Sequence, residues 1–222
     1  MKKEDKKIKL KALKPNFDYE VDQNNIELSP MMIVDEGNIA LGTISDCDLE
    51  DVTGERMVFR LVKFKNVNLH RNVMLKHIEL MDVRFENCDL SNVDFGEASL
   101  YRVEFINCKI IGMNLSDATL RDVTFDHCNG QYAFFSYMNC KQVEFLHCQL
   151  TAADFTNATM VNVEFQECAL VQVQFNFTAL KGIDFTTCDI GGLGVNIPDV
   201  KGAVVTPYQA LALCELLGLV VK

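Results

Sequence analysis

Large apolar residues recur at every fifth position along most of the chain. They occupy the multiples of five from Leu75 to Phe125 and most of those from Phe135 to Ile190. Smaller apolar residues, such as Val83, recur two positions earlier, and polar residues fill most of the rest. A period of five fits neither an α-helix, at 3.6 residues, nor a long β-strand, at two. The pattern therefore predicts short extended segments, each with two inward side chains and followed by a turn.

A second, longer period, equal to four of these repeats, is superimposed on the first. Cysteine holds the smaller apolar position at Cys88, Cys108, Cys128, Cys148, Cys168 and Cys188, and phenylalanine holds the larger one at Phe85, Phe105, Phe125, Phe145, Phe165 and Phe185. Because equivalent positions stack on one another in a solenoid, four five-residue sides make one coil. The predicted fold is all-β, a right-handed four-sided β-helix.

The same pattern runs upstream, shifted by one residue, from Val34 to Leu69. Between Leu69 and Leu75 the spacing is six, which predicts one extra residue within residues 70–74, accommodated as a bulge. We therefore assign residues 34–200 to the β-helix. Residues 1–33 are expected to form a basic flexible arm followed by an N-terminal cap.

A short helix is predicted at the C-terminal end, in residues 201–222. Thr206 can cap it, and Pro207 suits its first position. The tail is apolar enough to join two rods end to end as a homodimer, or else it covers only its own last coil. The expected dimer residues are Pro207, Tyr208, Ala210, Leu211, Leu213, Cys214, Leu216, Leu217 and Leu219.

Charge is unevenly distributed along the chain. Residues 1–14 carry seven lysines and two acidic residues, so the rest of the chain carries −15 against a total of −10. Such a body repels nucleic acid and anionic membranes and favours basic partners. The sequence contains no apolar run long enough to span a membrane and no secretory leader, and its nine cysteines then indicate reduced thiols, so a cytoplasmic location is expected.

Individual repeats resemble those of a known family. Cys88-Asp-Leu-Ser-Asn and Ala153-Asp-Phe-Thr-Asn are similar to the A-[DN]-L-x-x signature of pentapeptide-repeat proteins, a resemblance that covers about residues 34–200. The segment from Val200 to Leu213 resembles the C-terminal module of the Qnr and MfpA-like subgroup. This resemblance implies an acidic DNA mimic that binds DNA gyrase and topoisomerase IV, protects them from fluoroquinolones and dimerises through its C-terminal end.

The residues suggest two candidate surfaces. An acidic face follows the phenylalanine file, at Glu86, Glu104, Asp126, Glu144, Glu164 and Asp184. It either occupies the place of DNA phosphates on a partner or simply keeps a repetitive rod soluble. Near Gly130, where a large apolar residue is missing, lie Tyr132, Phe134 and Tyr137. They form an exposed aromatic contact patch, or the core repacks locally.

Catalytic and metal chemistry are not expected. His127-Cys128 and His147-Cys148 suggest zinc, but the histidines fall at outer corners while the cysteines point to the axis. The sequence contains no nucleotide-binding or hydrolase motif, and a filled core leaves no pocket. We therefore expect an interaction protein without cofactors. Its function is either that of a topoisomerase-binding DNA mimic or that of a scaffold for another protein partner.

Overall fold

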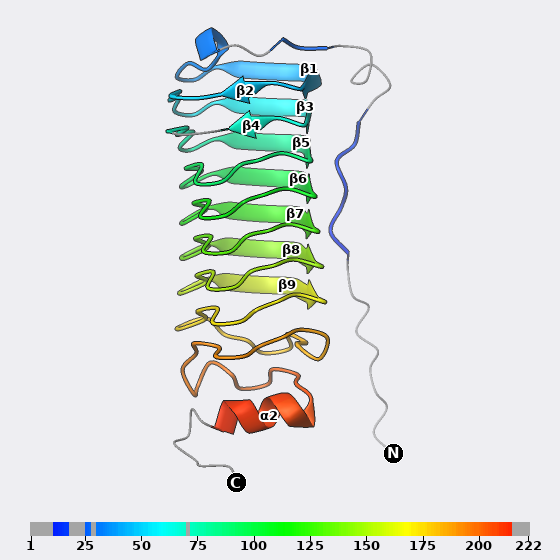
Figure 1. Ribbon diagram of the computed structural model, residues 1–222, viewed down its shortest axis with the longest axis vertical. Coiled ribbons are helices and arrows are strands. Elements are labelled where there is room, and N and C mark those ends of the chain that lie inside the picture. Colours follow the sequence, from blue (N-terminus) through cyan, green and yellow to red (C-terminus); the bar gives the residue numbers. More distant parts are fainter. Residues whose placement is uncertain (1–10, 18–24, 28–29, 70–71, 215–222) are drawn as a thin grey trace.

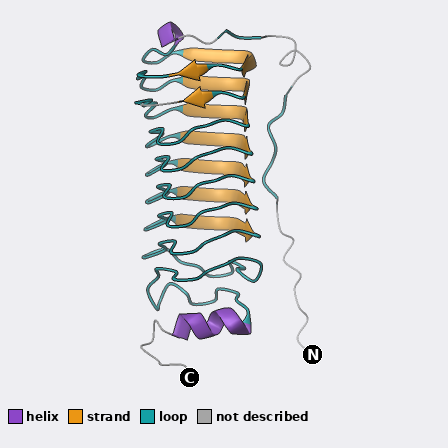
Figure 2. Cartoon of the chain, viewed as in Figure 1, coloured by secondary structure: helices purple, strands orange, loops and turns teal. Residues whose placement is uncertain are grey.

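The protein is an elongated stack of coils (Figure 1). The computed structural model describes residues 11–17, 25–27, 30–69 and 72–214. One long sheet runs along most of the stack, turns and loops complete its coils and form the last coils, and a helix lies at the C-terminal end (Figure 2). This is the right-handed four-sided β-helix that the five-residue period predicts.

Seven parallel strands form the main sheet, in the order β1-β3-β5-β6-β7-β8-β9. They are β1 (Asn38–Ser45), β3 (Val58–Lys65), β5 (Glu79–Glu86), β6 (Ser99–Ile106), β7 (Thr119–Asp126), β8 (Asn139–Leu146) and β9 (Thr159–Gln166). The short strands β2 (Asp48–Leu49) and β4 (Asn68–Leu69) pair on another side. Each long strand spans two of the predicted five-residue sides, because the ladder continues on both sides of the corner residue, as it does around Asp82.

The register confirms the longer period and its one interruption. In most pairs a residue faces the one that lies a full coil of four repeats further along the chain, as Glu79 faces Ser99. Val58 instead pairs with Glu79, one position beyond a full coil, while Met74 pairs with Asp94, at the regular spacing. The extra residue therefore lies between Leu69 and Met74, where the sequence predicts it.

Most of the residues predicted at every fifth position fill the core. The phenylalanine file is buried, and its rings stack face to face, with centroids 4.9 Å apart between Phe85 and Phe105. The six cysteines form a continuous internal column beside it. Each thiol contacts the backbone carbonyl of a phenylalanine in the preceding coil, as Cys128 Sγ does with the oxygen of Phe105 at 3.4 Å. At Gly130 the neighbouring Ile110 and Leu150 side chains occupy the space where a side chain is missing.

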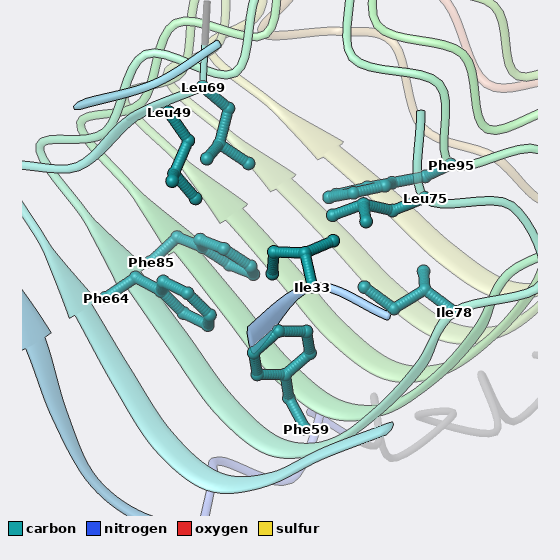
Figure 3. A pocket seen from close by; sticks show the side chains of 9 residues that line it. All are labelled: Ile33, Leu49, Phe59, Phe64, Leu69, Leu75, Ile78, Phe85 and Phe95. Atoms are coloured by element: carbon teal, nitrogen blue, oxygen red, sulfur yellow. The ribbon is translucent and has the colours of Figure 1, made fainter. Parts of the chain in front are cut away.

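The ends of the stack are closed differently. At the N-terminal end Ile33, which follows the short 3-10 helix η1 (Pro30–Met32), is buried against the first coils. It lines an apolar space of about 10 Å³, no larger than one water molecule (Figure 3). Val34, which the sequence analysis placed in the core, is instead half exposed.

At the C-terminal end α2 (Pro207–Leu213) begins at Thr206, as the sequence predicts. Thr206 and Gln209 form a capping box, in which each side chain bonds the backbone amide of the other residue. Gln209 is also buried, and its amide donates to the carbonyls of Phe185 and Cys188, both at 2.8 Å. The helix thus satisfies polar groups that the last coil leaves open.

Candidate functional site

The predicted acidic face lies on the outer surface of the main sheet. Register pairs place Glu104, Thr124, Glu144 and Glu164 in one column of successive coils. Glu104, however, is only 3% exposed and forms an ion pair with Arg84 at 2.6 Å. The prediction of a freely exposed carboxylate is wrong for Glu104, because the preceding coil supplies a cation in the same column.

The main sheet is nearly balanced in charge, which corrects the expectation of a negative stripe. Its seven strands carry eight acidic and seven basic residues. Asp82, for example, is bound by two guanidinium nitrogens of Arg102. Although burial opposes ionisation, hydrogen bonds from Arg102 and from the Asn16 amide hold the pKa of Asp82 below its usual value.

Part of the N-terminal arm lies along this sheet. Residues 11–17, here called the strap, run across the strands beside the stack (Figure 1). The Leu13 amide donates to Asp122 at 3.1 Å, and the Asn16 amide donates to Asp82 at 2.9 Å. Lys14 Nζ lies 3.6 Å from Glu104, and the amide of Ala12 is 3.4 Å from Glu144.

The strap corrects the assignment of these residues to a flexible arm. Pro15 is buried in the strap. The Phe17 ring lies 4.7 Å from Lys63 Nζ and 5.4 Å from the Arg84 guanidinium, so it shields two cations of the face. The sequence analysis missed this contact because no local pattern joins the arm to carboxylates that are distant along the chain.

The densest exposed negative charge lies instead on the first coil. Seven exposed acidic residues fall within residues 35–55, a stretch without lysine or arginine: Asp35, Glu36, Asp46, Asp48, Glu50, Asp51 and Glu55. A hydrogen bond from the Asn66 amide lowers the pKa of Asp46, which keeps that carboxylate ionised. A count of charge coil by coil along the sequence would have found this acidic first coil.

The other carboxylates of the predicted face differ in their surroundings. Asp126 lies within hydrogen-bond distance of two histidines. Asp184 accepts hydrogen bonds from the backbone amide and the hydroxyl of Thr186. Glu86 is partly exposed at the end of β5, and Glu164 lies next to Glu144 in the column. The six predicted residues therefore do not form one uniform acidic surface.

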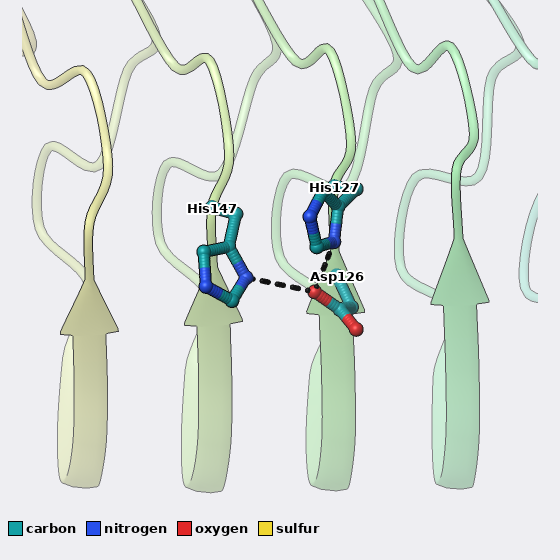
Figure 4. A group of neighbouring side chains, drawn as sticks. All are labelled: Asp126, His127 and His147. Carbon is teal, nitrogen blue, oxygen red and sulfur yellow. Dashed lines mark hydrogen bonds and ion pairs between the residues drawn. The ribbon is translucent and has the colours of Figure 1, made fainter.

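One group in the described part of the chain has the donor set of a cation site. His127 Nδ1 lies 2.7 Å and His147 Nδ1 lies 3.2 Å from the same oxygen of Asp126 (Figure 4). The two rings stack at 4.4 Å, and all three side chains are accessible at an outer corner. The adjacent Cys128 and Cys148 point into the core, as predicted, so they cannot share a metal with these histidines.

The predicted aromatic residues are exposed. Tyr132, Phe134 and Tyr137 lie on one side of a single coil and are 60%, 48% and 59% exposed. Phe134 pairs through its backbone with Asn114 and Asp154 in the adjacent coils, so polar side chains border it. These three residues, here called the aromatic patch, form an apolar area on the surface of the rod.

A shallow groove of about 340 Å³ crosses β5, β6 and β7. Arg60, Glu79, Met81, Tyr101 and Arg121 contribute to its lining. The Arg102 guanidinium stacks on the Tyr101 ring at 4.1 Å. These groups can bind a ligand, but they offer no nucleophile activated by a base.

The predicted dimer residues divide into three groups. Pro207, Tyr208, Ala210 and Leu211 are exposed on α2, Tyr208 by 84% and Leu211 by 50%. Leu213 packs partly against the core, and Cys214 is partly covered. Leu216, Leu217 and Leu219 lie outside the described residues. No helix in the described part of the chain is long and apolar enough to cross a membrane.

Comparisons with known proteins agree with this architecture. Residues 78–155 match the family model of the pentapeptide repeat region, and residues 148–186 match that of pentapeptide repeats in eight copies. The structure of a trypsin-treated form of QnrB1, a plasmid-mediated fluoroquinolone resistance protein, is similar to this chain with a TM-score of 0.52 and 21% sequence identity. The alignment covers 91% of this chain and 97% of the QnrB1 chain. HetL, a pentapeptide repeat protein involved in heterocyst differentiation regulation from Nostoc sp. strain PCC 7120, is 14% identical over 77% of this chain and 90% of its own, with a TM-score of 0.33. A search of curated proteins found no match.

Proposed function

Because this chain is a pentapeptide-repeat protein with a Qnr-like β-helix, we propose that it binds a type II topoisomerase, DNA gyrase or topoisomerase IV, without catalysing a reaction. In this proposal the rod takes the place of duplex DNA on the enzyme and protects it from fluoroquinolones. The partner surface that normally receives phosphates is basic, so it suits an acidic rod.

The acidic first coil is the observation that supports this function best. Its seven exposed carboxylates project from this coil and from the start of the next, where Glu55 stacks on Asp35, with no lysine or arginine among residues 35–55. A rigid coil holds these charges at a fixed spacing, just as the DNA backbone holds its phosphates at a fixed spacing. We therefore place the mimicry on the first coil and not on the balanced outer face of the main sheet.

A gyrase supercoiling assay, with and without a fluoroquinolone, tests this function. The wild-type protein is expected to inhibit supercoiling or to restore it in the presence of the drug. Neutralising Asp46→Asn, Glu50→Gln and Glu55→Gln together should weaken the effect, because three charges that face the basic site are lost. The matched control is Glu97→Gln, Asp117→Asn and Glu167→Gln, which removes three exposed charges elsewhere. Absence of any effect by the wild type on both enzymes would remove the proposal.

A second function, as a scaffold for a different protein partner, is supported by the aromatic patch. Exposed tyrosines and phenylalanines supply much of the binding free energy at protein interfaces. Replacing Tyr132, Phe134 and Tyr137 by alanine in the supercoiling assay shows which of the two surfaces contacts the topoisomerase. A DNA mimic acting through the acidic first coil keeps its effect, whereas a loss would assign the topoisomerase contact to the aromatic patch.

We also propose that two copies associate through α2. Tyr208 and Leu211 expose apolar surface at the end of the rod, where the last coil has no further coil to pair with. End-to-end association would double the length of the acidic body without covering the first coil, because α2 and the first coil lie at opposite ends of the stack (Figure 1).

A further inference from the structure

The strap is held mainly through its backbone, by carboxylates that it covers. Asp82 and Asp122 are only 6% and 2% exposed, and each accepts a hydrogen bond from a strap amide. Both residues occupy the corner column of the main sheet, two coils apart. Contacts of this kind recognise an extended chain and not one particular side chain.

The spacing of the carboxylates matches that of an extended peptide running along the rod. Two coils span about 9.6 Å, at about 4.8 Å between neighbouring strands. The three steps from Leu13 to Asn16 along the chain span about 10 Å when extended, at about 3.3 Å each. An extended chain that crosses the strands therefore presents an amide to Asp122 and another to Asp82 without distortion.

The side chains of the strap also fit the spacing of these carboxylates. Lys14 reaches Glu104 in the coil between the two aspartates. Pro15 lacks an amide hydrogen, yet it falls between the two donating residues, where no donor is needed. A proline also favours an extended conformation of the preceding Lys14, which lowers the entropy lost on docking.

We propose that two neighbouring columns, one with Asp82 and Asp122 and the other with Glu104 and Glu144, form a binding site for extended, lysine-bearing peptide segments, and that the strap fills it in cis. A segment of another protein with the same chemistry binds there by displacing the strap. The tether gives the strap an effective concentration in the millimolar range, so it lowers the apparent affinity of any segment in trans. This inference does not depend on binding to a topoisomerase.

The test uses the full-length protein and a fluorescein-labelled peptide that copies residues 9–17. The double variant Leu13→Pro and Asn16→Pro removes the two strap amides that donate to the buried aspartates. Peptide binding, followed by fluorescence anisotropy, is expected to be about tenfold tighter or more for this variant than for the wild type. Equal affinity for the two proteins, or no binding to either, would overturn the proposal.

Two peptides of equal charge test whether the register is specific. Lys14→Ala in the peptide removes the contact with Glu104, whereas Lys11→Ala removes an exposed lysine outside the register. The first change should weaken binding to the double variant several-fold more than the second. Equal losses would show that the face attracts any cationic peptide, which contradicts a built site.

Hydrogen exchange on the wild-type protein provides a measurement that needs no variant. The Leu13 and Asn16 amides should exchange more slowly than those of an unstructured peptide, because both donate to buried carboxylates. Adding an excess of unlabelled peptide should speed their exchange as the strap is displaced. Exchange at the unstructured rate without peptide would show that the strap does not occupy the site.

Discussion

At the scale of single residues, the corners of the coils impose the strictest requirement. The residue two positions after most large core residues has a positive φ, near 53° at Asn107 and 54° at Asn87. Asparagine, aspartate and histidine tolerate this conformation best, and β-branched residues worst. Within the described residues no valine, isoleucine or threonine adopts it, and Thr187 and Ile197, which fall at this place in the repeat, do not.

Replacing Asn107 by valine should therefore destabilise the protein by about 1–2 kcal/mol, the cost of a left-handed conformation for a side chain with a Cβ branch. Asn107→Gly should be close to neutral, because glycine accepts a positive φ. Denaturation with guanidinium, followed by circular dichroism, measures both. As a control, Thr119→Val places the same side chain at an exposed strand position. Equal effects at the two sites would contradict the explanation.

The thiols make a second residue-scale prediction. Seven of the nine cysteines are buried, while Cys47 and Cys214 are partly accessible. Burial raises the pKa of Cys140, and burial with the charge of Asp48 raises that of Cys47, so both remain protonated near neutral pH. A thiol reagent at pH 8 should therefore label at most two cysteines in the native protein and nine in denaturant. Rapid labelling of a third would place part of the column outside the core.

At the scale of elements, the local sequence pattern was sufficient to predict the repeating architecture of the coils. The two inward files, the four-repeat coil, the extra residue before Met74 and the start of α2 at Thr206 all follow from local pattern. The joining of two five-residue sides into one long strand could not be predicted from local pattern, because it depends on pairing between coils. The strap could not be predicted either, since its partners are distant and its contacts come from the backbone.

Gln209 is the buried residue of α2, so its contact with the last coil is easy to test. Gln209→Glu keeps the size of the side chain but replaces the donor with a carboxylate that faces the carbonyls of Phe185 and Cys188. Burying an unpaired acceptor costs about 1–3 kcal/mol or more. Amide exchange in residues 178–190 should accelerate, while that in β5 to β7 stays slow, because coils contact only their neighbours.

Gln209→Leu separates packing from hydrogen bonding at this site. Leucine fills similar space but leaves both carbonyls without a donor, so it should destabilise the last coil less than the charged glutamate does. If both variants had the same exchange rates as the wild type, the Gln209 side chain would not stabilise the last coil. In that case the helix would be held by its apolar contacts alone.

At the scale of the whole molecule, charge is segregated along the rod in a way that composition alone conceals. The net charge of −10 combines a lysine-rich arm, an acidic first coil and a main sheet of nearly balanced charge. The sequence analysis correctly expected an acidic body but placed its surface on the phenylalanine side. The error arose because the carboxylates were selected without the cations that stack on them from neighbouring coils, as Arg84 stacks on Glu104 in the same column.

The two ends of the rod then have different roles, and this difference predicts how copies associate. The first coil is polar and charged, whereas α2 exposes Tyr208 and Leu211. Placing glutamate at both positions should leave a monomer of 25.1 kDa, because burying two carboxylates in an apolar contact is costly, while the wild type sediments as a dimer.

Met31→Glu is the matched control, since Met31 is 89% exposed at the opposite end and receives the same change from apolar to charged. Sedimentation velocity at micromolar concentration compares the three proteins, and circular dichroism shows that each remains folded. Dissociation by Met31→Glu would place the contact at the N-terminal end, where it would compete with partner binding to the acidic first coil. A monomeric wild type would mean that α2 only covers its own last coil. A dimer lost only with the α2 substitutions leaves the acidic first coils at the two far ends, where each can meet a partner.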